Sequence, residues 1–199
     1  MKSQRIFAID PGNTYSGFAV IDMPNFHLLD FGKVENENLL MLLESMSATL
    51  PAFGDPDVYV IEKIASYGMP VGADVFDTCI WIGQFSHALK ERKTAYVFRK
   101  DEKITLCGTM KAKDANIRQE LINRYAKFDY KNGKGTKKNP DTFYGVSKDV
   151  WAAIAVGVTY YEMQKEKQKT WQNVRTIAQP AHKNALKKDL LRHRTRRAT

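Results

Sequence analysis

Short apolar runs, each followed by turn residues, alternate with helical patterns along most of this chain. Residues 6–9 are continuously apolar and end at Asp10, Pro11-Gly12-Asn13 follows, and a second apolar run begins at Phe18. This order predicts a strand, a tight turn and a second strand. Because an uninterrupted apolar run is typical of a strand covered on both faces, we expect Asp10 at the end of a buried central strand. A carboxylate in that position needs a cation, backbone N–H groups or a metal beside it.

The alternation continues through the first 162 residues. Strands are expected over 26–34, 57–62 and 94–98, helices over 38–50, 71–92, 113–125 and from Ser147 through Tyr161, and a short helical turn over 101–106. The helices are predicted from apolar residues spaced three and four apart. Residues 127–145, rich in Lys, Gly and Asn, are predicted to be irregular. The strand–helix–strand order favours parallel pairing of 57–62 with the first strand, so the pattern predicts an α/β fold with a five-stranded mixed sheet flanked by helices.

Three carboxylates fall at one end of the predicted sheet. Asp10 and Glu62 end two strands that we expect to be parallel neighbours, and Asp149 opens the last helix. Ligand sites in open α/β sheets lie beyond the carboxyl ends of the strands. Oxygen donors without nearby Cys or His suit Mg²⁺ or Mn²⁺, and two such ions would clamp an in-line phosphodiester cleavage. Taken singly, each has a structural alternative: Asp10 as a turn cap, Glu62 as a surface residue, Asp149 as a partner of the helix dipole.

The positive charge of the chain is concentrated at its C-terminal end. The net charge is +9, and residues 162–199 contain 11 Lys or Arg against 3 acidic residues, a net +8. We therefore expect a near-neutral domain over residues 1–162 and a basic, flexible tail over 163–199. Such a tail predicts a polyanion partner, most simply nucleic acid, with a solubilising segment as the alternative.

Membrane association is not expected from this sequence. No apolar stretch approaches the length of a membrane span, and the one short apolar run in the first nine residues belongs to the predicted first strand rather than to a secretory signal. These patterns predict a cytoplasmic protein, or one of the host cytoplasm if it is viral.

Four segments carry a family resemblance. They are Ala8-Ile9-Asp10-Pro11-Gly12 with Ser16-Gly17-Phe18-Ala19, then Val60-Ile61-Glu62, then Cys107-Gly108-Thr109-Met110-Lys111-Ala112-Lys113, and last Lys148-Asp149-Val150-Trp151-Ala152-Ala153-Ile154-Ala155. In the same order, they resemble the motifs of the RuvC family of Holliday junction resolvases, which has a ribonuclease H-like fold. The similarity covers residues 5 to about 162. With its basic tail, the chain looks like a phage-type member rather than a compact bacterial one.

The resemblance implies a metal-dependent endonuclease that cuts branched DNA, such as a Holliday junction or a related replication or recombination intermediate. Asp10, Glu62 and Asp149 become catalytic ligands of two Mg²⁺ or Mn²⁺ ions. The family pattern also has an acidic or histidine position three residues from the last carboxylate. Here that position is Ala152 or Val146, neither of which can bind a metal. Asp114 or Asp141 can replace it only if its segment folds back to the site.

The resemblance and the charge pattern also imply the partners. The residues expected to contact DNA are basic: Lys111, Lys113, Arg118, Lys131, Lys134, Lys137, Lys138, Lys148, Lys187, Lys188, Arg192 and Arg194. The lysines of 127–145 equally suit a solvated, flexible loop. Phe143 and Tyr144 either stack on unpaired bases at a junction or pack beneath the last helix. The apolar residues of helix 71–92 cover more than one face, which fits a homodimer through this helix.

Two other functions remain open at this level. The pattern Asp10-Pro11-Gly12-Asn13-Thr14-Tyr15-Ser16-Gly17 also resembles the phosphate loop of actin-like ATPases and sugar kinases, although that superfamily normally needs two such domains. The incomplete ligand set leaves room for a DNA-binding module of the same fold with impaired catalysis. Retention of all three principal carboxylates argues against that module.

Overall fold

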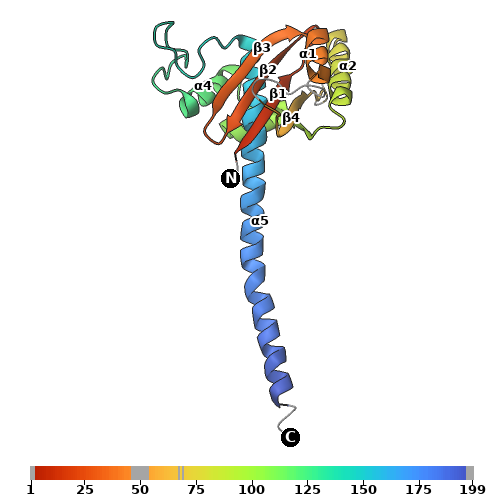
Figure 1. The fold of residues 1–199 in the computed structure, drawn as a ribbon, viewed down its shortest axis with the longest axis vertical. Coiled ribbons are helices and arrows are strands. Elements are labelled where there is room, and N and C mark those ends of the chain that lie inside the picture. Colours follow the sequence, from red (N-terminus) through yellow and green to blue (C-terminus); the bar gives the residue numbers. More distant parts are fainter. Residues whose placement is uncertain (1–2, 46–53, 67, 69, 196–199) are drawn as a thin grey trace. The chain divides into compact units, whose positions relative to one another are not determined.

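The computed structural model of this protein describes residues 3–45, 54–66, 68 and 70–195, with side chains up to residue 175 in the last helix. It contains one sheet with the strand order β3-β2-β1-β4-β5 (Figure 1). The strands are β1 (Gln4–Asp10), β2 (Tyr15–Met23), β3 (His27–Glu35), β4 (Val58–Lys63) and β5 (Thr94–Phe98). β1, β2 and β3 form an antiparallel meander, whereas β1, β4 and β5 are parallel. The predicted five-stranded mixed sheet is thus confirmed.

Helices cover both faces of this sheet. They are α1 (Asn36–Ser45), α2 (Ala73–Ala88), α3 (Arg99–Cys107), α4 (Asp114–Tyr125) and α5 (Lys148–Thr195). In β1, Ile6 and Ala8 belong to the core shared with α3, α4 and α5, while Phe7 and Ile9 belong to the core shared with α1 and α2. Side chains alternate between the two faces of a strand, so the continuous apolar run of β1 supplies both cores.

Small residues let α5 approach the sheet closely, as its alanine-rich sequence predicts. Ala153 is fully buried, and a Cβ added to Gly157 would lie 3.1 Å from the Cβ of Ala8 in β1. At the start of the helix, a Cβ added to Gly17 would lie 2.5 Å from the carbonyl oxygen of Asp149. Gly17 of β2 is therefore needed where the N-terminal turn of α5 lies against the sheet.

Several expected helix limits were wrong. The helix expected over 71–92 is shorter, at Ala73–Ala88, and the short turn expected over 101–106 is the longer helix α3. The expected helix 38–50 is α1, which begins at Asn36; residues 46–50 of that prediction lie outside the described residues. The last helix, expected to end near Tyr161, continues to Thr195.

The chain forms two compact units, Met1–Glu162 and Met163–Thr199. The first contains the sheet and the buried residues of both cores. Within the described part of the chain, no helix combines the length and the apolar character needed to cross a membrane.

Candidate active site

Asp10 and Glu62 lie side by side at the carboxyl ends of parallel strands. Ile9 of β1 is paired with Ile61 of β4, so the next residue on each strand is one of the two acids. Their carboxyl groups share a hydrogen bond. Burial raises the pKa of both groups. The pKa of Asp10 is raised further by Glu62, and the pKa of Glu62 is raised further by the negative charge of Glu102. The predicted pairing of these two residues follows from the parallel register alone.

A buried hydrogen-bond network shapes the turn after Asp10. Asn36, at the start of α1, is fully buried and donates from its side-chain amide to the carbonyl oxygen of Gly12 at 3.0 Å. Its amide oxygen accepts a hydrogen bond from Ser16 at 2.6 Å, and its backbone N–H donates to Thr14 at 3.0 Å. These bonds hold the turn that follows Asp10 against α1. Asn36 has no distinguishing pattern in the sequence, so sequence reasoning missed it.

Asp149 lies at the rim of the same site, in the first turn of α5. Its carboxylate forms a 3.1 Å ion pair with Lys33 of β3, and both side chains are more than two-fifths exposed. An exposed ion pair of this kind contributes only about 0–1 kcal/mol to stability. The carboxylate of Asp149 can therefore leave Lys33 at little energetic cost.

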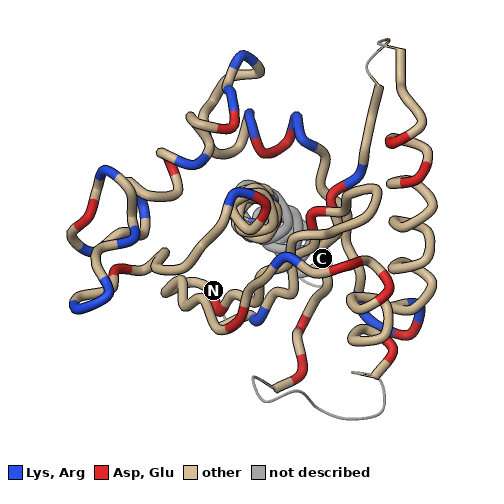
Figure 2. Tube along the Cα trace, turned by 90° about the horizontal axis from the view of Figure 1, so that it is seen from above, with Lys and Arg blue, Asp and Glu red and all other residues tan. Residues whose placement is uncertain are grey.

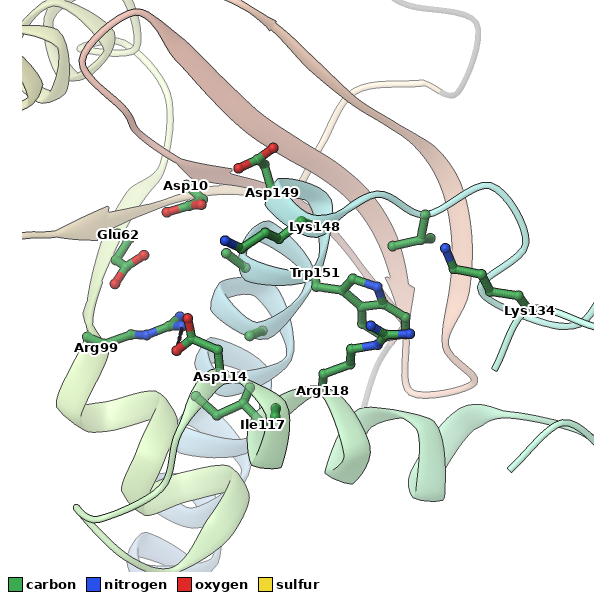
Figure 3. A pocket seen from close by; sticks show the side chains of 14 residues that line it. Asp10, Glu62, Arg99, Asp114, Ile117, Arg118, Lys134, Lys148, Asp149 and Trp151 are labelled. Atoms are coloured by element: carbon green, nitrogen blue, oxygen red, sulfur yellow. Dashed lines mark hydrogen bonds and ion pairs between the residues drawn. The ribbon is translucent and has the colours of Figure 1, made fainter. Parts of the chain in front are cut away.

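The three carboxylates open into one pocket with a volume of about 590 Å³. Figure 3 shows Asp10 and Glu62 at one side of this pocket, with Lys148 pointing toward them. Arg118 and Lys134 line its other side. The Arg118 guanidinium lies 5.1 Å from the ring centroid of Trp151, a cation–π contact that helps to position it. The carboxylates of Asp10 and Glu62 thus lie at one side of the pocket with Lys148 pointing toward them, and the other side carries the positive charges of Arg118 and Lys134.

Arg99, at the start of α3, brings a cation to the acidic side of the pocket. Its guanidinium is 2.5 Å from a carboxylate oxygen of Glu102 and 2.5 Å from one of Asp114. Glu102 is completely buried, and within the described residues its second oxygen has no hydrogen-bond partner. The positive charge of Arg99 also acts against the raised pKa of Asp10 and Glu62. Sequence reasoning missed Arg99 and Glu102, because their spacing is also common on exposed helices.

Of the two carboxylates that could replace the fourth metal ligand, Asp114 and Asp141, only Asp114 lies at the pocket. Asp114 does line the pocket, where it is paired with Arg99. Asp141 does not: its buried carboxylate accepts hydrogen bonds from the backbone N–H groups of Lys127, Phe128, Asp129 and Thr142. Ala152 lines the pocket but offers no donor. Asp114 is therefore the additional carboxylate that the fold places there.

The residues expected to contact DNA are distributed over three regions. Arg118, Lys134 and Lys148 line the pocket. The others with described side chains are exposed and lie outside it: Lys111, Lys113, Lys131, Lys137 and Lys138. The remaining four lie in α5 beyond its described side chains: Lys187, Lys188, Arg192 and Arg194.

The donor chemistry of the site fits a divalent cation. Asp10 and Glu62 supply hard oxygen atoms, and a cation bound to both would offset the cost of burying their negative charge, which is the main cause of their raised pKa values. Asp149 and Asp114 lie within the same pocket. Across the described residues, no three His, Cys, Asp or Glu side chains converge closely enough to hold a metal together. A complete ligand set therefore requires Asp149 or Asp114 to leave its present basic partner.

The Asp10–Glu62 pair predicts an unusual dependence of stability on pH. Because both pKa values are raised, the folded protein binds more protons than the unfolded chain above about pH 4. In EDTA, the free energy of unfolding should fall as the pH rises from 5 to 8.5. Asp10→Asn should weaken this dependence and raise the melting temperature at pH 8.5; each kcal/mol corresponds to about 2–4 °C for a chain of this size.

Melting temperatures of wild type and variant at the two pH values measure this effect. Asp30→Asn, at an exposed carboxylate of β3, is the matched control and should melt like the wild type. Added Mg²⁺ or Mn²⁺ should stabilise the wild type at pH 8.5 and have little effect on Asp10→Asn. An equal pH dependence of the melting temperature in the wild type, Asp10→Asn and Asp30→Asn would show that the Asp10–Glu62 pair is not its cause.

The fold of this protein is similar to that of known Holliday junction resolvases. No protein-family model and no curated protein matches this sequence. The structure of RuvC from Thermus thermophilus is similar, with a TM-score of 0.57 and 16% identity over 82% of this chain and 96% of that one. The fold is RuvC-like. This confirms the predicted ribonuclease H-like architecture.

Two further structures have the same fold. T. thermophilus RuvC in complex with a Holliday junction substrate has a TM-score of 0.56 and 13% identity, over 82% of this chain and 96% of that one. The yeast mitochondrial Holliday junction resolvase has a TM-score of 0.51 and 12% identity, over 84% of this chain and 82% of that one. At these identities the likeness establishes the RuvC-like fold alone.

Proposed function

We propose that this protein is a metal-dependent endonuclease that hydrolyses phosphodiester bonds in branched DNA, a phage-type member of the RuvC family that acts in the host cytoplasm. The observation that carries the proposal is the Asp10–Glu62 pair at the ends of two parallel strands, opening into a pocket whose other side is basic. The RuvC-like fold supports a nuclease, and the complex of T. thermophilus RuvC with a Holliday junction supports branched DNA as substrate. The basic tail supports the phage-type assignment.

Each part of the pocket has a role in this proposal. Asp10, Glu62 and Asp149 hold Mg²⁺ or Mn²⁺, two ions when the set is complete. The metal supplies Lewis-acid stabilisation of the phosphate charge and lowers the pKa of the attacking water. Lys148 and Arg118 bind the phosphates on either side of the scissile bond, because guanidinium and ammonium groups pair with phosphate oxygens. Arg99 limits the repulsion among the carboxylates.

One observation favours a second candidate, a DNA-binding module with impaired catalysis. Asp149 is paired with Lys33, and Asp114 with Arg99, so two of the four carboxylates are neutralised by basic partners. If these ion pairs persist when DNA binds, the metal would have only two firm ligands. The same pocket would then bind DNA without cutting it.

Cleavage of defined substrates separates the two candidates. A labelled four-way junction, a Y-fork and a linear duplex of the same sequence are incubated with the protein and Mg²⁺ or Mn²⁺, and with EDTA as control. A nuclease should cut the branched substrates in the presence of metal and leave the duplex largely intact. Tight binding to the junction without cutting would favour the impaired module. Neither binding nor cutting would direct attention to the actin-like resemblance and a nucleotide titration.

A homodimer through α2 is part of the proposal, because a two-fold assembly can make paired cuts in a four-way junction. Phe76 and Ile80 lie one helical turn apart on α2 and are 61% and 58% exposed. We expect a dimer at micromolar concentration in sedimentation velocity, and a monomer for Ile80→Glu. Met41→Glu, an exposed apolar position on α1, is the matched control and should remain dimeric. A monomeric wild type would exclude this interface.

A further inference from the structure

The α4–α5 loop (residues 126–147) contains no helix or strand, which agrees with the irregular segment predicted over 127–145, but hydrogen bonds hold it in a defined structure. The buried carboxylate of Asp141 accepts hydrogen bonds from the backbone N–H groups of Lys127 at 2.8 Å, Phe128 at 3.0 Å and Asp129 at 2.7 Å. Several N–H donors to one buried carboxylate make a strong anchor. The first residues of the loop are therefore held to its last part.

A second carboxylate and a glycine complete the structure of the loop. Asp129 accepts backbone hydrogen bonds from Asn132 at 3.0 Å and Gly135 at 3.0 Å. Gly133 has a φ of +72°, and a Cβ there would lie 2.7 Å from the ring of Phe143, which is fully buried in the core. The tip of the loop is thus packed against the domain, and Phe143 packs inside rather than offering a ring to a base.

The outer surface of the loop combines positive charge with aromatic rings. Its lysines are Lys127, Lys131, Lys134, Lys137 and Lys138, and its two acids are the inward-bonded Asp129 and Asp141. Lys and Arg positions are concentrated along this loop in Figure 2. Phe128, Tyr130 and Tyr144 are 46%, 59% and 43% exposed.

Two of these rings are already fixed in place. The hydroxyl of Tyr130 donates to the carbonyl oxygen of Lys127 at 3.2 Å, and its backbone carbonyl accepts from Gln119 of α4 at 2.9 Å. The Phe128 ring lies against Gly135, where an added Cβ would be 3.1 Å from it. A ring that is held before binding loses little conformational entropy when a ligand stacks on it.

The loop also borders the candidate active site. Lys134 lines the pocket that contains Asp10 and Glu62 (Figure 3). Nucleic acid that occupies the pocket therefore passes beside Lys134 of this loop, and the other lysines and the rings belong to the same hydrogen-bonded loop. In a fully paired duplex the bases stack on one another, so only unpaired bases offer a face to an exposed ring.

We infer that the α4–α5 loop is a preformed platform for unpaired nucleotides of the DNA substrate, with its lysines on the phosphates and Tyr130 and Phe128 stacked on bases. The inference rests on the proposed nuclease function for the identity of the nucleic acid. It narrows the substrate class to branched DNA that has unpaired nucleotides next to the scissile bond. Stacking on bases is tolerant of sequence, so the platform selects DNA structure rather than sequence.

Binding without metal tests the platform independently of cleavage. Fluorescence anisotropy in EDTA gives dissociation constants for a twelve-nucleotide oligothymidylate, a Y-fork with unpaired arms and a fully paired duplex. Tyr130→Leu should weaken binding to the first two by about 5- to 100-fold, the range expected for one lost base–ring contact, and leave duplex binding within about twofold. Tyr130→Phe should lose much less affinity than Tyr130→Leu, because it retains the stacking ring and loses only the hydroxyl contact with Lys127.

Two further variants sharpen the result. Tyr96→Leu is the matched control: Tyr96 is also exposed, but its hydroxyl contacts Ser86 of α2, on the opposite side of the sheet, and its loss should change nothing. Lys137→Gln with Lys138→Gln should weaken all three DNAs alike, since phosphates occur in each. Equal weakening of duplex and unpaired DNA by Tyr130→Leu, or none of either, would overturn the platform. If binding to unpaired DNA depends on the Tyr130 ring but the protein cuts no substrate, the platform proposal stands and the proposed nuclease function is wrong.

Discussion

Asp10→Asn should abolish metal-dependent cleavage of a four-way junction while leaving junction binding intact. Asp10 shares a hydrogen bond with Glu62 at the acidic side of the pocket. Among the described residues, the other two carboxylates of the pocket, Asp149 and Asp114, form ion pairs with basic side chains, whereas Asp10 and Glu62 do not. Metal stabilisation of the developing phosphate charge is worth several kcal/mol, and each ~1.4 kcal/mol is tenfold in rate. We expect a loss of about 10³-fold or more.

Single-turnover cleavage with Mn²⁺ or Mg²⁺ measures this loss, and anisotropy in EDTA measures binding. The affinity for DNA should stay the same or increase, because the variant removes negative charge from a phosphate-binding pocket. Glu62→Gln should behave alike, whereas Asp30→Asn should cut at the wild-type rate. Normal cleavage by Asp10→Asn would exclude this pair from catalysis. Asp149→Asn shows whether the third carboxylate leaves Lys33 to take part.

Removing the unit Met163–Thr199 should produce the second large effect, a change in the salt dependence of DNA binding. This segment has 11 Lys or Arg against 2 acidic residues, a net +9 that equals the net charge of the whole chain. If about eight of its basic side chains meet phosphates, the slope of log affinity against log salt should become shallower by roughly 7 when the segment is removed. Among the side chains of α5 that the structure describes, up to residue 175, the buried ones all precede residue 163, so truncation after Glu162 should leave the core intact.

Two full-length variants separate the effect of charge from the effect of removing residues 163–199. Changing Lys187, Lys188, Arg192 and Arg194 to Gln should reduce the slope by roughly 3–4. Exchanging Lys for Arg and Arg for Lys at these four positions retains the charge and should retain the slope. An unchanged slope in the truncated protein would remove the segment from DNA binding. The melting temperature of the truncated protein verifies that its core still folds.

The parts of the site that follow from local pattern were predictable. An apolar run that ends on a carboxylate specifies where Asp10 and Glu62 leave their strands, and the strand–helix–strand order specifies that the two strands are parallel. The position of Asp149 likewise follows from the start of a helix. These features depend on a few consecutive residues and on chain connectivity, so no knowledge of side-chain packing is needed.

The parts that depend on burial and partner choice were not predictable. Arg99 and Glu102 form an ordinary (i, i+3) pair in sequence, and only packing makes Glu102 fully buried beside the pocket. The sequence allows Asp141 as a ligand if its segment folds back to the site, but its carboxylate instead holds the backbone of the α4–α5 loop. Whether a carboxylate binds a metal, a guanidinium or backbone N–H groups depends on which groups the fold places within about 3 Å of it.

By itself, the sequence determined the mixed sheet, the strand ends that carry Asp10 and Glu62, and the separation of a near-neutral domain from a basic segment. These follow from hydrophobic periodicity, chain order and net charge, which are local or additive properties. Only the tertiary structure decided that Asp114 enters the pocket, that Asp149 pairs with Lys33, and that a Lys-rich loop is ordered and reaches the same pocket through Lys134. Such outcomes require residues far apart in sequence to compete for the same few partners, and that competition is resolved only when the chain packs.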